Sequence, residues 1–193
     1  MVFNPIKPAL LMLMYFSALT GIIYPLIVTF SAQAFLPRQA NGSLIIDDNN
    51  QALGSELIGQ AFSRPEYFWG RPSATSPHPY NAGASSGANQ GPANPALLEA
   101  VQTRIKALRN ADPKNTKPIP VDLVTASASG LDPDISPAAA VFQIERIAAA
   151  RHLPVPKVQE LVKRYTEPRL WRILGEPRVN VLKLNLALDQ RLK

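Results

Sequence analysis

The stretch ALLMLMYFSALTGIIYPLIVTFSAQAF, residues 9–35, decides the organisation of this chain. No charged residue lies between Lys7 and Arg38, whereas a helix needs only about 20 apolar residues to cross the hydrocarbon core of a bilayer. The stretch is apolar on every helical face, as lipid surroundings require. We therefore predict a transmembrane helix at residues 9–35, after a short segment at residues 1–8 and before a separate domain at residues 36–193.

Small or weakly polar residues recur every four positions within this span, at Ser17, Gly21, Pro25 and Thr29. Such spacing lets helix backbones approach closely, so we predict that these four residues contact partner helices. Pro25 also removes the usual donor for the carbonyl of Gly21 and is expected to bend the helix there. The alternative is a simple lipid anchor, in which Gly and Pro are commonly tolerated.

A cleaved signal peptide is the competing interpretation of the span, because Ala32-Gln33-Ala34 matches the small-residue cleavage pattern. The apolar segment is about twice the usual signal-peptide core, which favours an uncleaved anchor. Lys7 and the terminal amine favour a cytoplasmic N-terminus, which places residues 36–193 on the extracytoplasmic side. Cleavage after Ala34 would instead give a secreted solute-binding module, and this alternative stays open.

Composition limits what the domain at residues 36–193 can be. It has the length of one ordinary domain. The chain has no cysteine, so neither disulfides nor thiolate metal sites are available. The net charge of the chain is +6, but in the last third the basic residues are interleaved with acidic ones. Such mixing is typical of solvated helix faces rather than of a nucleic-acid site.

Periodicity predicts a small mixed α/β or α+β domain. Strands are expected at residues 43–46, 56–62 and 119–125, and helices at residues 94–110, 136–152 and 157–166. Asn94-Pro95 and Ser136-Pro137 are typical helix starts, a capping side chain followed by proline. Residues 170–174 are expected to add a helical turn. Residues 179–189 fit either a strand, from alternating leucines, or a helix capped by Asn180.

Residues 63–95 are rich in Pro, Gly, Ser and Asn, which argues against regular structure. Disordered segments have few aromatic residues, yet this one contains Tyr67, Phe68, Trp69 and Tyr80. We therefore predict a long ordered loop, with Phe68 covering the domain core. Tyr67, Trp69 and Tyr80 of this loop, together with Arg71, are predicted contacts with a partner protein.

Catalytic patterns are incomplete. Ser127 and Ser129 in ASASG lack the first glycine of a nucleophile elbow, and nothing in the sequence fixes His78 or His152 beside them. A membrane-tethered hydrolase using either serine remains only as an alternative. No GxxxxGK[ST] phosphate-binding motif occurs.

Asp132, Asp134 and Ser136 resemble the opening of a calcium loop. Pro137 and Gln143 occupy the positions where that loop needs Gly and Glu. We therefore predict no metal site, no directly bound cofactor and a non-catalytic domain.

Five motifs, in this order after one N-terminal span, resemble the C subunits of Kdp-type potassium-transporting ATPases. They are LIGQAF (57–62), YFWGRPSAT (67–75), YNAGASSGANQGPANPAL (80–97), VDLVTASASGLDPDISPAAA (121–140) and LGEPRVNVLKLNLALD (174–189). One departure is SSGANQGP, where that family more often has a doubled glycine, serine and asparagine followed by leucine. The resemblance covers nearly the whole chain.

The resemblance implies a bacterial inner-membrane complex that imports potassium at the expense of ATP. A channel-like subunit would carry the ion, a P-type ATPase subunit would hydrolyse ATP, and this chain would assemble with both as an accessory subunit. ATP and K⁺ therefore belong to the complex, although the family is described as a catalytic chaperone that raises the ATP affinity of the hydrolysing subunit. Asn89 is a further predicted partner contact. Asp122, Asp132 and Asp134 are expected to attract cations near the outer ion entrance.

Overall fold

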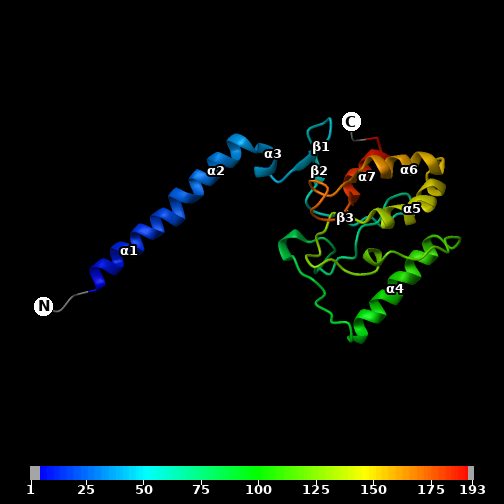
Figure 1. Ribbon diagram of the computed structural model, residues 1–193, viewed down its shortest axis with the longest axis horizontal. Coiled ribbons are helices and arrows are strands. Elements are labelled where there is room, and N and C mark those ends of the chain that lie inside the picture. The colour runs from blue at the N-terminus through cyan, green and yellow to red at the C-terminus, as the bar shows by residue number, and fades with distance from the viewer. Residues whose placement is uncertain (1–4, 191–193) are drawn as a thin grey trace. The chain divides into compact units, whose positions relative to one another are not determined.

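The structure, a computed structural model, describes residues 5–190 and divides the chain into two units that meet between Leu44 and Ile45 (Figure 1). Residues 1–4 of the predicted N-terminal segment lie outside the described residues. The first unit consists mainly of helix, and the second contains all of the long-range packing described below.

The first unit contains one apolar helix of 30 residues, Ile6–Phe35, long enough to cross a membrane. It is built from helix α1 (Ile6–Ala18), a π-helical turn (Leu19–Ile23) and helix α2 (Tyr24–Phe35), and a short helix α3 (Pro37–Ala40) follows. The helix therefore begins three residues before the predicted span and includes Lys7.

Where a bend is predicted at Pro25, the structure has a π-helical turn just before the proline, at Leu19–Ile23. The N–H of Tyr24 donates to the carbonyl of Leu19, five residues earlier. The proline ring clashes with the carbonyl four residues before it in a regular α-helix, and a π-helical turn relieves this conflict by widening the backbone. The hydroxyl of Thr20 also donates to the carbonyl of Phe16, at 2.7 Å.

The second unit combines two small antiparallel sheets with helices, as the sequence predicts. Strands β1 (Leu44–Ile46) and β2 (Ala52–Ser55) form a hairpin. The other sheet has the order β3-β5-β4, with strands β3 (Asp134–Ile135), β5 (Arg178–Asn180) and β4 (Thr166–Glu167). The helices are α4 (Pro95–Ala111), α5 (Pro137–Ala150), α6 (Val155–Arg164) and α7 (Val181–Leu188).

Side-chain caps begin three of these helices. Asn94 accepts from the N–H of Ala96, and Ser136 accepts from the N–H of Ala139, which confirms both predicted helix starts. Asn180 accepts from the N–H of Lys183. Residues 179–189 are therefore a strand end followed by a helix, because the side chain of Asn180 satisfies an N–H group at the start of α7.

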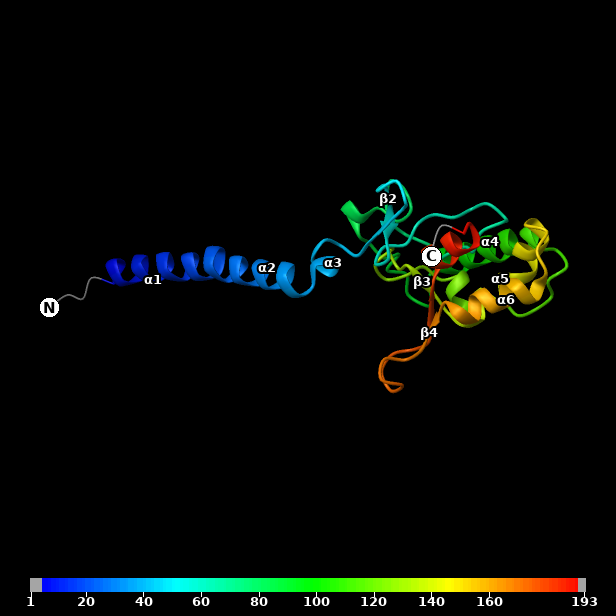
Figure 2. The same ribbon diagram turned by 90° about the horizontal axis from the view of Figure 1, so that it is seen from above.

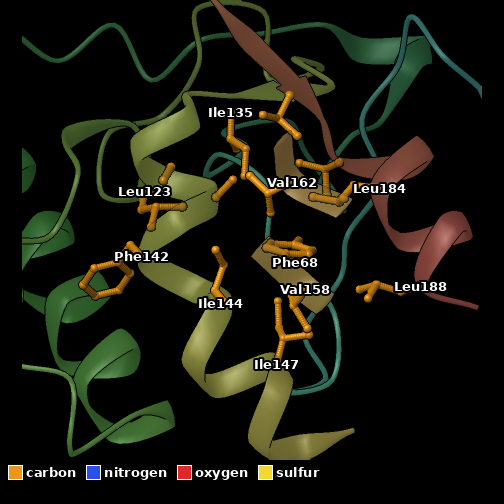
Figure 3. Close-up of a cluster of buried hydrophobic side chains, with 14 of the residues drawn as sticks. Phe68, Leu123, Ile135, Phe142, Ile144, Ile147, Val158, Val162, Leu184 and Leu188 are labelled. Carbon is orange, nitrogen blue, oxygen red and sulfur yellow. The ribbon is translucent and has the colours of Figure 1, made fainter. Parts of the chain in front are cut away.

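The core of the second unit lies where α5, α6 and α7 meet the loop between β2 and α4 (Figure 3). Phe68 of the loop is fully buried among these helices, as predicted. The residues packed around it include Ile144 and Ile147 of α5, Val158 and Val162 of α6, and Leu184 and Leu188 of α7.

The strand predicted at residues 56–62 is wrong. The second strand is β2, which ends at Ser55, and residues 56–62 form a turn and irregular chain. Two hydrogen bonds hold this segment in place of the ladder that a neighbouring strand would provide. The amide of Gln60 donates to the carbonyl of Leu53, and the N–H of Gly59 donates to the carbonyl of Leu131.

The strand predicted at residues 119–125 is also wrong, because that segment contains only a 3₁₀ turn at Val121–Leu123. Pro118 and Pro120 lack the N–H groups that a strand ladder needs. Val121 is exposed, whereas Leu123 is buried.

Residues 170–174 do not form the predicted helical turn. Leu170 and Leu174 pair as an antiparallel bridge, and Trp171 and Arg172 between them have positive φ values of 51° and 65°. A helix requires negative φ values at these positions. The segment is the end of the excursion between β4 and β5, drawn in orange in Figure 2, which extends away from α5 and α6.

Candidate functional site

The aromatic loop between β2 and α4 is attached to the helices by two buried amide side chains. Asn185 of α7 accepts from the N–H of Phe68 at 2.8 Å and donates to its carbonyl at 3.0 Å. Gln143 of α5 makes the same pair of bonds to Trp69, at 2.8 and 3.1 Å. We call this arrangement the amide clamp. It satisfies the backbone of two consecutive loop residues, as a strand partner would.

Arg146, one turn after Gln143, extends the clamp. Its guanidinium donates to the carbonyl of Tyr67 at 3.0 Å and to Gln143 Oε1 at 2.7 Å. It also lies over the ring of Trp69, 4.2 Å from the centroid, a cation–π contact. Burial lowers the pKa of Arg146 to about 10, although the charges of Asp112 and Glu66 oppose this shift.

Tyr67 is attached separately to the end of α7. Its hydroxyl donates to Asp189 at 2.9 Å, and Arg151 donates to the same carboxylate at 2.7 Å. Arg151 also donates to the carbonyl of Glu66. Tyr67 and Trp69, both predicted as partner contacts, are therefore half-buried and hold the loop on its own domain.

The other two predicted loop contacts, Arg71 and Tyr80, lie together. The hydroxyl of Tyr80 donates to the carbonyl of Arg71 at 2.6 Å, and Arg71 pairs with Asp132 at 3.0 Å. Burial raises the pKa of Tyr80 to about 12, and the negative charge of Asp132 raises it further, while Arg71 lowers it. A cavity of about 300 Å³ beside these residues is lined mostly by apolar groups and by Arg104.

The three predicted cation-attracting carboxylates all have partners inside the domain. Asp122 accepts from the N–H of Ser136 at 2.7 Å, Asp132 pairs with Arg71, and Asp134 pairs with Arg178 at 3.1 Å. Burial raises the pKa of Asp134, although the charge of Arg178 opposes this shift. Within residues 5–190 no cluster of His, Asp or Glu has an arrangement that could hold a metal ion.

The remaining predicted contacts are exposed. Asn89 lies in the loop with a positive φ of 50°. In the first unit, Ser17, Gly21, Pro25 and Thr29 are all exposed. A Cβ atom added to Gly21 would meet nothing within 4 Å in this chain. Contacts of these residues with a partner stay predictions.

The hydroxyls considered for the hydrolase alternative are not arranged for catalysis. Ser127 is buried, and the hydroxyl of Ser129 accepts from the N–H of Leu131 at 3.1 Å. In the described part of the chain, the one side-chain hydrogen bond of His78 is to the carbonyl of Pro79, and His152 has none. Among the described residues, neither histidine therefore hydrogen-bonds to Ser127 or Ser129.

Comparison with known proteins places the chain in a family. Residues 6–190 match the family model described as "KdpC: K+-transporting ATPase, c chain". The chain belongs to the KdpC family. The potassium-transporting ATPase KdpC subunit of Methylococcus capsulatus is 67% identical over 186 residues, which are 96% of this chain and 97% of the relative. The subunits of the same name from Herpetosiphon aurantiacus and Dechloromonas aromatica are 65% and 59% identical, each over 95% of this chain and 95% and 96% of the relatives.

Sequence reasoning did not identify the polar residues that hold the loop of this KdpC chain. Gln143 lies among alanines and isoleucines on the buried face of α5, and Asn185 lies among leucines on the buried face of α7. A polar amide on an otherwise apolar helix face needs a hydrogen-bonding partner. An amide side chain on an apolar helix face was therefore the feature of the sequence that could have identified Gln143 and Asn185. The sequence does not say, however, which backbone groups these amides bind.

Proposed function

We propose that this chain is the accessory, non-catalytic C subunit of an ATP-driven potassium import complex in the bacterial inner membrane. The observation that carries the proposal is the family match over residues 6–190, together with relatives named as KdpC subunits of potassium-transporting ATPases. Its partners would be a P-type ATPase subunit and a channel-like subunit. ATP and K⁺ would act at the level of that complex.

The helix Ile6–Phe35 supports a single-pass anchor. All of its 30 residues are too exposed in this chain to serve as a protein core, so lipid or partner helices are the surroundings that suit them. Lys7 at its start favours a cytoplasmic N-terminus. On this topology the second unit lies on the extracytoplasmic side, where it can contribute to assembly and to guarding the outer potassium entrance.

The catalytic-chaperone role implied by the resemblance fits this topology only as an indirect effect. A domain outside the membrane has no access to cytoplasmic ATP. We therefore propose that any change in the ATP affinity of the hydrolysing subunit passes through contacts of the membrane helix. A change in affinity of this kind is a coupling between two sites and requires a shared two-state element in the complex.

Co-purification tests the assembly role. The chain is isolated from bacterial membranes in mild detergent, and its companions and N-terminus are identified by mass spectrometry. Recovery with a P-type ATPase and a large channel-like membrane protein, intact from Met1, is the expected result. Recovery alone as a soluble form that begins at Phe35 would favour the secreted binding module instead.

Side-chain substitutions locate the membrane contact. Because a Cβ atom at Gly21 would meet nothing within 4 Å in this chain and Gly21 lies outside the second unit, Gly21→Leu should leave the domain folded, and any loss of the companions reports on partner helices. Ala34→Leu, outside the four-residue spacing, is the matched control. Equal recovery of companions with both variants would remove the predicted helix contact.

The sidedness is tested with a single cysteine, since the natural chain has none. Asn89→Cys introduces a thiol at an exposed loop position. A membrane-impermeant maleimide should label it from outside intact spheroplasts. Labelling only after the membrane is opened would reverse the proposed orientation.

A further inference from the structure

The excursion between β4 and β5 exposes an unusual amount of apolar surface. We call residues 168–177 the apolar tip. Its four large apolar side chains are 60% exposed at Leu170, 78% at Trp171, 76% at Ile173 and 53% at Leu174. No other stretch in the described part of the second unit gathers four exposed large apolar side chains within five positions. Such patches mark binding surfaces.

The tip is held in a defined shape. The N–H groups of Leu170 and Leu174 each donate to the other residue's carbonyl at 2.9 Å. Below this bridge, both carboxylate oxygens of Glu176 accept from Arg169, at 2.6 and 2.7 Å. Trp171 at the turn has a positive φ, which is unfavourable for a large side chain. The chain therefore presents Trp171 outward at a cost in backbone energy.

A free cation accompanies these apolar groups. Within residues 5–190 the side chain of Arg172 has no ion pair or hydrogen bond. Tryptophan prefers the headgroup region of a bilayer, where its ring is in apolar surroundings and its N–H remains hydrated. Arginine binds phosphate through several N–H groups, and anionic headgroups attract basic segments. The tip therefore has the chemistry of a membrane-interface anchor.

The proposed membrane anchor holds the second unit close to a bilayer. Residues 36–44 join the end of the apolar helix to the second unit, and a linker of this length spans at most about 30 Å. Such a short tether keeps the membrane surface at a high effective concentration around the domain. A tethered patch therefore needs less affinity for lipid than a free one. The net charge of +6 also complements an anionic surface.

We propose that the apolar tip inserts into the headgroup region of the bilayer that the same chain spans, with Arg172 bound to anionic phospholipid. This inference rests on the proposed membrane anchor. It adds a second contact between the domain and the membrane, which limits how far the domain can tilt or rotate about its linker.

Fluorescence quenching tests the insertion. The full chain is reconstituted into phosphatidylcholine vesicles with and without phosphatidylglycerol, with bromine on the upper acyl carbons as quencher. The chain has two tryptophans, and Trp69 is held in the domain by its hydrogen bond to Arg64. Quenching and a blue-shifted emission are expected for the natural chain. Most of the quenching should be lost in Trp171→Phe.

Further variants separate the electrostatic contribution of Arg172 from the apolar contribution of Leu170. Arg172→Gln should lower the ratio of inserted to free tip on the order of fivefold in anionic vesicles and leave it unchanged in phosphatidylcholine alone. Leu170→Ala should weaken insertion in both kinds of vesicle. Leu98→Ala is the matched control, because Leu98 on α4 is also 60% exposed, and it should have no effect.

Two results would overturn the proposal. Equal quenching of the natural chain and Trp171→Phe, in vesicles that retain the chain through alkaline carbonate extraction, would show that the anchor holds and the tip stays out of the membrane. Protection of Trp171 from aqueous acrylamide only in the assembled complex would assign the tip to a partner subunit instead. Extraction of the chain by carbonate would refute the anchor itself, and this proposal with it.

Discussion

Replacing Asn185 by leucine tests whether the amide clamp holds the aromatic loop on its domain. The substitution removes both hydrogen bonds to Phe68 and leaves that residue's N–H and carbonyl unpaired. Each buried unpaired group costs about 1–3 kcal/mol, so the two together cost about 2–6 kcal/mol. Asn185 is only 1% exposed, so the gain from burying the larger leucine is offset by overpacking of about 1–3 kcal/mol.

A loss of this size is large beside the total stability of an ordinary domain, about 5–15 kcal/mol. With a urea dependence of about 1–3 kcal/mol per molar, the unfolding midpoint should fall by about 1–2 M or more. The assay is urea unfolding of the full chain in detergent, followed by the fluorescence of Trp69 in a Trp171→Phe background. Asn110→Leu, at an exposed position on α4, is the matched control and should leave the midpoint unchanged. A midpoint for Asn185→Leu equal to that of the control would refute the clamp.

Two further predictions concern close packing and charge. Gly59→Ala should destabilise the domain by about 1–3 kcal/mol in a thermal unfolding assay, because the new Cβ would lie 2.4 Å from Tyr80. Gly91→Ala is the control and should be nearly neutral in that assay, because its Cβ would meet nothing within 4 Å. Burial is the largest single influence on the pKa of Lys183 and lowers it, but the hydrogen bonds and charges of Glu56 and Glu167 together outweigh burial and leave the pKa raised above its ordinary value of 10.5. The charged Lys183 side chain therefore contributes its full share to the free energy of unfolding below pH 10.5, and this share is lost as the pH rises further. A Lys183→Met variant should not show this loss of stability at alkaline pH when the free energy of unfolding is measured as a function of pH.

The helices were predictable because their signals are local. Asn94 and Ser136 each begin a helix with a side-chain cap, and a cap needs only the next three residues to form. Asn180 caps α7 in the same way, but the alternating leucines that follow it fitted a strand equally well, so this helix was not decided by the sequence. The apolar helix Ile6–Phe35 is equally local, since its length and the absence of charge suffice. These elements depend little on what packs against them.

The short strands were not predictable in the same way. Strands β3 and β4 have two residues each, and their partner β5 lies far along the chain from β3. Two residues carry no period-2 pattern, so tertiary pairing alone determines them. The aromatic residues 67–69 illustrate the same limit. Their composition predicted order, but the hydrogen bonds that hold residues 69 and 68 come from Gln143 and Asn185, 74 and 117 positions away.

The amide clamp also bears on how this domain could serve an assembly. Residues 63–95 contain almost no regular structure, and side chains of α5 and α7 supply hydrogen bonds that a sheet would otherwise provide. An unanchored loop of this length would lose much conformational freedom on binding a partner, and that loss would weaken the complex. Gln143 and Asn185 fix residues 68 and 69 when the domain folds. These two residues therefore lose no further conformational freedom when a partner binds. If the exposed remainder of the loop, including the predicted contact Asn89, binds a partner, it would do so at a smaller cost in conformational entropy.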